Sequence, residues 1–444
     1  MNQNNEFPSN NLYQQSGIGI YSNSNSDDKI PIILVNNETV MLLPDGRVIV
    51  WGDGYANPVP PEIAKLRDIV SLKATIFAVA ALRANGSVVA WGKPDSGGKI
   101  PDDIAQLQDI VSLSSAIFAF AALRANRSVV AWGDPKSGGE IPDDIARLQD
   151  IVSLSSIGFD ISATSATFAA LRANGSVVTW GEQRYGGQVP PEIAQLRDII
   201  SLSSVGNTFI ARRANFRLVT WGRYPMPPEI AKWQDIVSLS STGGAFAALR
   251  ANGSVVAWGD ERYGSQVPPE IATLRDIVSL SATNYAFAAL RADRSVVSWG
   301  NINIPPEIAT LKDIVSLHTA IGSYSFTGSS FTALRADRSV ISWGNVSVPP
   351  EIAKLKDIVS LSAANDAFAA LRANGSVVTW GYQLNDHGKR IAGSDVQVPP
   401  GIARLQDIVS LSASGNSFAV LRRNGQIVAW NTNNDNIVHS EYDD

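Results

Sequence analysis

The sequence contains no cysteine, and this absence excludes several kinds of chemistry at once. Without thiols the chain has no disulfide framework, no thiolate metal site and no thiol nucleophile. Histidine is scarce too, because only His318, His387 and His439 are present, far apart and with no Gly-x-Ser-x-Gly motif. We therefore predict no catalytic residues, no metal site and no cofactor, and we expect that the protein is not an enzyme.

Charged residues and long apolar runs are also few. Only 17% of the 444 residues are charged and the net charge is -5, so the chain lacks the basic field that a nucleic acid partner requires. The sequence has no run of about 18 apolar residues, which predicts no membrane span. Residues 1–28 lack the apolar core of a secretory signal. We expect a soluble protein without a signal peptide, either cytoplasmic or released by a route other than Sec.

What the chain does contain is a repeat. Ten of its 11 tryptophans recur at spacings of 37 to 50 residues, as Trp51, Trp91, Trp132, Trp180, Trp221, Trp258, Trp299, Trp343, Trp380 and Trp430. Such a period is typical of propellers and solenoids, in which each unit is one small element stacked on its neighbours. We predict a flexible polar tail over residues 1–28, one repetitive body over 29–430, and a polar acidic tail over 431–444.

Each unit has the pattern of a short helical turn followed by three strands, with room for a short fourth. Pro-Pro-Glu-Ile-Ala predicts the turn, with Asp102-Asp103 and Asp143-Asp144 in its first positions in two copies. Asp-Ile-Val-Ser-Leu predicts the first strand, and Phe-Ala-Ala-Leu-Arg and Val-Val-Ala-Trp predict a hairpin. Because both faces of the hairpin are apolar, we expect each sheet to lie between two others.

The Asn-Gly between the hairpin strands predicts a type I′ turn, in which both central residues have positive φ. In the copy at 79–91 this turn would place Leu82 opposite Val89 and Ala80 opposite Trp91. Four copies carry a bulky residue where the others have Gly, namely Arg127, Phe216, Arg294 and Arg338. We expect each to adopt the left-handed region at a cost of about 1 kcal/mol.

The repeat Phe-Ala-Ala-Leu-Arg-x-[Asn/Asp]-Gly-x-Val-x-x-Trp-Gly resembles that of the regulator of chromosome condensation family over about residues 30–430. The resemblance implies an all-β, tandem-repeat β-propeller of about ten units of about 40 residues, either a closed ring or an open superhelical stack. In repeat length the chain is similar to bacterial members such as the β-lactamase inhibitor type. It departs from the family pattern because the usual Gly-x-x-His-[Ser/Thr] before the Leu strand is missing.

One Arg and one Asp recur in nearly every unit. They could form a ring of charges for an anionic ligand, but a feature of every unit is more simply architectural, so we expect each Arg to pair with an Asp or with loop carbonyls. By the same argument we place in the core the Trp and Phe residues that recur from unit to unit, here called the Trp and Phe columns.

Function is expected where the repeats differ, because loops carry specificity on a repetitive scaffold. Two units have insertions, at 157–167 and 319–330, and the segments after Trp-Gly vary. Arg and aromatic residues are favoured anchors of protein interfaces. The candidate binding residues in these loops are Phe159, Asp160, Arg184, Tyr185, Tyr224, Arg262, Tyr263, Tyr324, Phe326 and Tyr382.

These loops lead to several functional hypotheses. The first is a non-catalytic protein-interaction scaffold that binds a protein partner through variable loops on one rim of the repeat body. The family resemblance implies two alternatives: a guanine nucleotide exchange factor or GTPase-regulating bacterial effector, and a protein inhibitor of a secreted enzyme such as a β-lactamase. Aromatic loops also permit a glycan-binding module. The sequence leaves the oligomeric state open.

Overall fold

The computed structural model describes residues 13–14, 32–35, 38–52, 55–56, 58–157, 166–320, 329–384, 390–433 and 437–440. This part of the chain forms ten antiparallel sheets, here called blades 1 to 10 in chain order. Each blade has a first, a middle and a third strand. The first strands are β2 (Ile32–Val35), β5 (Ile69–Ala74), β8 (Ile110–Ser115), β11 (Ile151–Ile157), β14 (Ile199–Val205), β17 (Ile236–Ser241), β20 (Ile277–Ala282), β23 (Ile314–Ala320), β26 (Ile358–Ala363) and β30 (Ile408–Ser414).

The middle strand pairs with both others in its blade. The middle strands are β3 (Glu38–Leu42), β6 (Ala78–Arg83), β9 (Ala119–Arg124), β12 (Thr167–Arg172), β15 (Thr208–Arg213), β18 (Ala245–Arg250), β21 (Ala286–Arg291), β24 (Ser330–Arg335), β27 (Ala367–Arg372) and β31 (Ser417–Arg422). The third strands are β4 (Val48–Trp51), β7 (Val88–Gly92), β10 (Val129–Gly133), β13 (Val177–Gly181), β16 (Leu218–Gly222), β19 (Val255–Gly259), β22 (Val296–Gly300), β25 (Val340–Gly344), β28 (Val377–Leu384) and β32 (Ile427–Asn431).

The predicted helical turn precedes the first strand in blades 2 to 10. These turns are α1 (Pro61–Ala64), α2 (Asp102–Ala105), α3 (Asp143–Ala146), α4 (Pro191–Ala194), α5 (Pro228–Ala231), α6 (Pro269–Ala272), α7 (Pro306–Ala309), α8 (Pro350–Ala353) and α9 (Pro400–Ala403). Short 3-10 turns follow the third strand in four blades: η1 (Pro94–Ser96), η2 (Pro135–Ser137), η3 (Gln183–Tyr185) and η4 (Glu261–Tyr263). In the described residues, no helix has the length or apolar character that a membrane span requires.

Among the residues that the structure describes, three blades have a fourth strand. β1 (Tyr13–Gln14) pairs with β17, β29 (Arg390–Asp395) with β28, and β33 (His439–Ser440) with β32. β1 and β33 come from the segments that the sequence analysis placed in the two polar tails, so at least these short stretches contact the repeat body.

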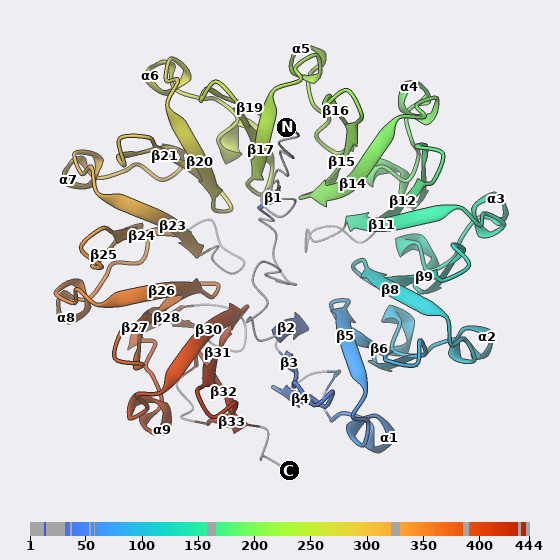
Figure 1. Cartoon of the computed structure of the whole chain (residues 1–444), viewed down its shortest axis with the longest axis horizontal. Coiled ribbons are helices and arrows are strands. Elements are labelled where there is room, and N and C mark those ends of the chain that lie inside the picture. The colour runs from blue at the N-terminus through green and yellow to red at the C-terminus, as the bar shows by residue number, and fades with distance from the viewer. Residues whose placement is uncertain are drawn as a thin grey trace, which may run out of the picture.

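The blades form a closed ring, with the helical turns on its outer circumference and the first strands running inward from them (Figure 1). Blade 1 meets blade 10 in one apolar cluster formed by Ile32, Met41, Leu43, Trp51, Ala419, Ile427 and Ala429. Across the same seam, the indole Nε1 of Trp51 donates to Oδ1 of Asn431 at 2.7 Å, and the Thr39 and Ser417 hydroxyls lie 2.7 Å apart. The predicted all-β repeat propeller is confirmed, and of its two forms the closed ring is present.

Neighbouring blades pack unlike faces together. The face of blade 2 that carries Leu82 and Val88 lies against the face of blade 3 that carries Phe120 and Trp132. The two aromatic rings of blade 3 stack at 5.3 Å, and both are fully buried. This arrangement recurs around the ring and confirms that the Trp and Phe columns belong to the core.

The predicted hairpin register is wrong by one residue on the third strand. Leu82 lies opposite Val88 rather than Val89, and Val79 rather than Ala80 lies opposite Trp91. The loop has three residues, because the Arg83 N–H donates to the Ser87 carbonyl and only Gly86 has positive φ, at +79°. A type I turn followed by a left-handed Gly has this pattern. The four bulky replacements do have left-handed φ values of 63° to 67°, as predicted.

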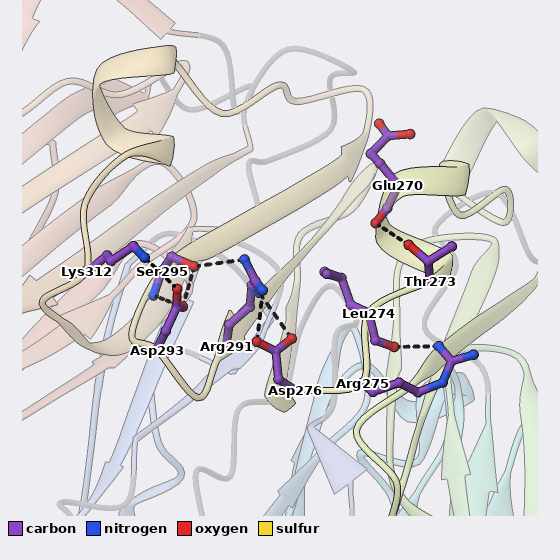
Figure 2. Close-up of polar contacts among 9 residues, drawn as sticks. All are labelled: Glu270, Thr273, Leu274, Arg275, Asp276, Arg291, Asp293, Ser295 and Lys312. Atoms are coloured by element: carbon purple, nitrogen blue, oxygen red, sulfur yellow. Dashed lines mark hydrogen bonds and ion pairs between the residues drawn. The ribbon is translucent and has the colours of Figure 1, made fainter.

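The repeated Arg pairs with the repeated Asp inside each of blades 2 to 10, which confirms the architectural role. The guanidinium-to-carboxylate distances are 2.7 to 3.0 Å. Figure 2 shows one pair, Arg291 with Asp276, which ties the end of β21 to the start of β20. Trp233, the tryptophan outside the repeat, replaces a turn Leu, and its ring lies 4.2 Å from the Arg250 guanidinium.

Candidate functional site

Where the structure describes them, the variable loops lie at the inner ends of the blades. Figure 1 shows the first strands running toward the middle of the ring, so the loop from first to middle strand lies there. The third strand ends at the same place, because Gly92 at the end of β7 is opposite Ala78 at the start of β6. In the described part of the chain, both kinds of loop therefore lie toward the middle of the ring rather than at its circumference.

Three predicted binding residues come together with their neighbours in what we call the Arg/Tyr cluster. It consists of Arg223 and Tyr224 of blade 5, Asp260, Arg262 and Tyr263 of blade 6, and Tyr285 of blade 7. The rings of Tyr263 and Tyr285 stack at 5.1 Å across the boundary between blades 6 and 7. The Arg223 guanidinium lies 5.3 Å from the ring of Tyr224, and that of Arg262 lies 5.9 Å from the ring of Tyr263.

Ion pairing and neighbouring charges connect the members of the Arg/Tyr cluster. Arg262 donates to both carboxylate oxygens of Asp260, at 3.1 and 2.6 Å. This hydrogen bonding lowers the pKa of Asp260, and the charge of Arg223 lowers it further. The same contact raises the pKa of Arg262, to which the phenols of Tyr263 and Tyr224 also contribute. The cluster thus joins two exposed guanidinium groups with tyrosine rings that are half-buried.

Two glycines allow Tyr263 to lie where it does. A Cβ on Gly243 would come within 3.0 Å of the Tyr263 ring, and one on Gly244 within 2.7 Å. The ring therefore lies directly against the backbone that follows β17. The hydroxyl of Thr242 donates to the Tyr263 carbonyl at 2.9 Å, which fixes the loop and the ring together.

The structure does not bring the other predicted residues into this cluster. In blade 4, Arg184 is exposed, while Tyr185 is half-buried and packs between blades. Tyr382, on β28 of blade 9, packs against the cluster that contains Trp380. The remaining predictions, Phe159, Asp160, Tyr324 and Phe326, lie outside the described residues.

Sequence reasoning missed a second aromatic group, in blades 1 to 3. Tyr55 and Phe77 meet edge to face at 5.4 Å, Phe77 stacks on Phe118 at 6.0 Å, and the Lys93 ammonium lies 5.3 Å from the Phe77 ring. These aromatic residues lie outside the repeated motif, and this departure from the repeat is the feature by which the sequence could have singled them out. Their proximity could not be predicted, because it depends on how the blades are arranged in the propeller.

A set of exposed aliphatic residues was also missed. One aliphatic side chain in each first strand from blade 2 to blade 10 is 41 to 55% exposed: Val70, Val111, Val152, Ile200, Val237, Val278, Val315, Val359 and Val409. In blade 2 the register of β5 against β6 shifts between Ile69 and Ser71, and Val70 is the extra residue of this bulge. Strand periodicity does not reveal such a position, because the bulge interrupts it.

Among the described residues, no group of three or more His, Asp or Glu side chains could hold a metal ion. His318 contacts the Ser316 hydroxyl at 3.1 Å, and His439 stacks on Trp51 with ring centroids 4.6 Å apart. His387 lies outside the described residues.

The strand pairing and the loop arrangement define a class of protein, a repeat β-propeller with ten blades in one ring. No protein-family model matches the sequence, and no curated protein matches it either. Among solved structures, the chain is similar to the CRINKLY WD40 ectodomain of the Arabidopsis thaliana receptor kinase ACR4, at 18% identity, 64% of this chain, 96% of that one and a TM-score of 0.33.

Two other solved structures are similar to a comparable degree. Prp20p from Saccharomyces cerevisiae, described with its binding to Gsp1p and histones, is 17% identical over 74% of this chain and 73% of its own, with a TM-score of 0.31. Human WBSCR16 is 12% identical over 81% of this chain and 88% of its own, with a TM-score of 0.34. The ten blades are defined by the strand pairing of the described residues, and closure of the ring rests on the contacts between blades 1 and 10.

Proposed function

We propose that the protein is a non-catalytic interaction scaffold that binds a protein partner through the Arg/Tyr cluster at the inner ends of blades 5 to 7. The observation that carries the proposal is the cluster itself, because Arg and Tyr are the residue types that dominate protein interface energies. Its guanidinium groups are exposed, while its rings are fixed by stacking and by the Gly243–Gly244 backbone.

The cluster is also ordered before any partner binds. Asp260 holds the Arg262 side chain, and Asp260 also accepts from the Arg262 backbone N–H at 3.0 Å, at the start of η4. Thr242 fixes the Tyr263 carbonyl from the neighbouring loop. An interface whose side chains are already held loses less conformational entropy on binding, which favours affinity.

The test is capture of partners by the full-length protein, followed by their identification and a binding titration with the purified partner. We expect the double variant Arg223→Glu/Arg262→Glu to bind roughly 30-fold more weakly, as the loss of interface hot spots does. Arg147→Glu is the matched control, because Arg147 is an exposed arginine at the end of the outer turn α3. Equal binding by the double variant, with an unchanged melting temperature, would refute the proposal.

The identity of the partner separates the scaffold from the alternatives. A small GTPase whose release of labelled GDP accelerates would indicate an exchange factor. A hydrolase that loses activity on binding would indicate an inhibitor, and retention on a glycan array would indicate a glycan-binding module.

A further inference from the structure

The first strands offer unpaired edges. In the described part of the chain, β5, β8, β11, β14, β20, β23, β26 and β30 each pair with a neighbour on one side only. The edge of a sheet presents a row of backbone N–H and C=O groups and is a template for another strand. The inner part of β17 is also uncharged, since Leu239, Ser240 and Ser241 lead into Thr242 and the Gly243–Gly244 pair. No charged side chain of this stretch opposes an added strand.

The β17 edge is already used in this way. β1 pairs with β17 in parallel, with Tyr13 opposite Leu239 and Gln14 opposite Ser240. The Thr242 N–H donates to Ala245 at the start of β18, so by strand alternation the N–H groups of Leu239 and Ser241 point away from β18, toward the edge that β1 occupies. Figure 1 shows β1 beside β17 near the middle of the ring.

The occupied edge leads into the Arg/Tyr cluster. β17 continues through Thr242 into Gly243–Gly244, the backbone against which Tyr263 lies. A parallel strand on β17 runs in the same direction, so its C-terminal end points toward Tyr263. Residues 8–19, which surround β1, contain no charged side chain, which matches the uncharged edge.

We propose that the β17 edge is a docking site for an extended, uncharged peptide segment, and that the N-terminal segment around Tyr13–Gln14 occupies it within the chain until a partner segment of the same chemistry displaces it. Main-chain pairing along β17 supplies affinity, as in other cases of β-strand addition. This proposal rests on the proposed function in one respect. It takes the Arg/Tyr cluster as the site where a partner binds, and it names the kind of partner segment that reaches this cluster.

The test uses the full-length chain and a fluorescent peptide with the sequence of residues 8–19. The variant Tyr13→Pro/Gln14→Pro removes both N–H groups of β1, which a paired strand does not tolerate. We expect the peptide to bind this variant about tenfold or more tightly than it binds the wild type, because a tethered competitor acts at an effective concentration in the millimolar range. A peptide with the same two proline substitutions is the control and should not bind either protein.

Hydrogen exchange locates the site. In the wild type the amides of residues 236–241 should exchange more slowly than those of 277–282, because β20 has nearly the same sequence without an added strand. The difference should vanish in the variant and return when the peptide is added. Equal exchange in wild type and variant, or protection by the peptide at other blades only, would overturn the proposal. Neither measurement needs the natural partner, so this result is independent of the Arg223→Glu/Arg262→Glu experiment.

Discussion

At the scale of single residues, the hairpin turn shows how the repeat tolerates exceptions. The third loop position has left-handed φ in the Asn-Gly copies and equally in the copies with Arg127, Phe216, Arg294 and Arg338. The flanking blade determines this conformation, because the Gly86 carbonyl accepts from the Ile110 N–H and the Arg127 carbonyl accepts from the Ile151 N–H, both at 3.0 Å. A side chain with a Cβ therefore adopts a backbone conformation that it disfavours in isolation.

Replacing Arg127 by Gly should therefore stabilise the protein by about 1 kcal/mol, since a non-glycine residue in the left-handed region is strained by that order. The free energy of unfolding, measured by urea titration, reports the change. The reverse control is Gly86→Ala, whose Cβ would come within 2.5 Å of the Gln108 carbonyl oxygen and should lower stability. A destabilised Arg127→Gly variant would contradict the strain argument.

At the scale of elements, two hairpin turns combine a carboxylate with a lysine of the next blade. The turns β21–β22 and β24–β25 have Asp293 and Asp337 where most other copies have Asn, the exception being Asp45 in the β3–β4 turn. Asp293 accepts hydrogen bonds from the Ser295 hydroxyl and N–H, and Lys312 of the next blade lies 3.3 Å away (Figure 2). These contacts, with those to Ser295 the largest, lower the pKa of Asp293 to about 2, and the equivalent contacts of Ser339 and Lys356 lower the pKa of Asp337 to about 2.

These two turns should make part of the stability sensitive to acid. A carboxyl whose pKa is lower in the folded state contributes stability above its unfolded pKa of about 4 and loses it as the pH falls toward 2. The double variant Asp293→Asn/Asp337→Asn keeps an acceptor for the serine but does not titrate. Its free energy of unfolding should therefore fall less than that of the wild type between pH 4 and pH 2, and parallel curves would show that these turns do not contribute.

The same elements show what the sequence can predict. The strands, the helical turns and the Arg–Asp pairs follow from local pattern, and all are present. The predicted hairpin register was wrong because Asn-Gly fits both a two-residue and a three-residue loop, and the structure has the three-residue loop. The exposure of Val70 and its equivalents results from a β-bulge, and nothing in the apolar sequence of the strand predicts where a bulge lies.

At the scale of the whole molecule, closure places distant residues together. Individual members of the Arg/Tyr cluster could be selected from the sequence as Tyr224, Arg262 and Tyr263, but their proximity depends on the order of blades in the ring. Tyr285 was not selected, because its role comes from stacking across a blade boundary. Closure has one local signature in the sequence, since the last copy reads Trp430-Asn431 where the other copies read Trp-Gly.

Asn431 should accordingly control the seam between blades 1 and 10. Its Oδ1 accepts from the Trp51 indole at 2.7 Å and from the Ser417 hydroxyl at 2.9 Å, so Asn431→Ala leaves a buried N–H without this acceptor, at a cost of about 1–3 kcal/mol. Because each blade contacts only its neighbours, the loss should act locally. We expect faster hydrogen exchange in β2–β4 and β30–β32 but unchanged exchange in β14–β19, while Asn301→Ala, at an exposed asparagine, should change neither region. Uniformly faster exchange around the ring would instead mean that the blades unfold as one cooperative unit and that the seam is no weaker than the other blade boundaries.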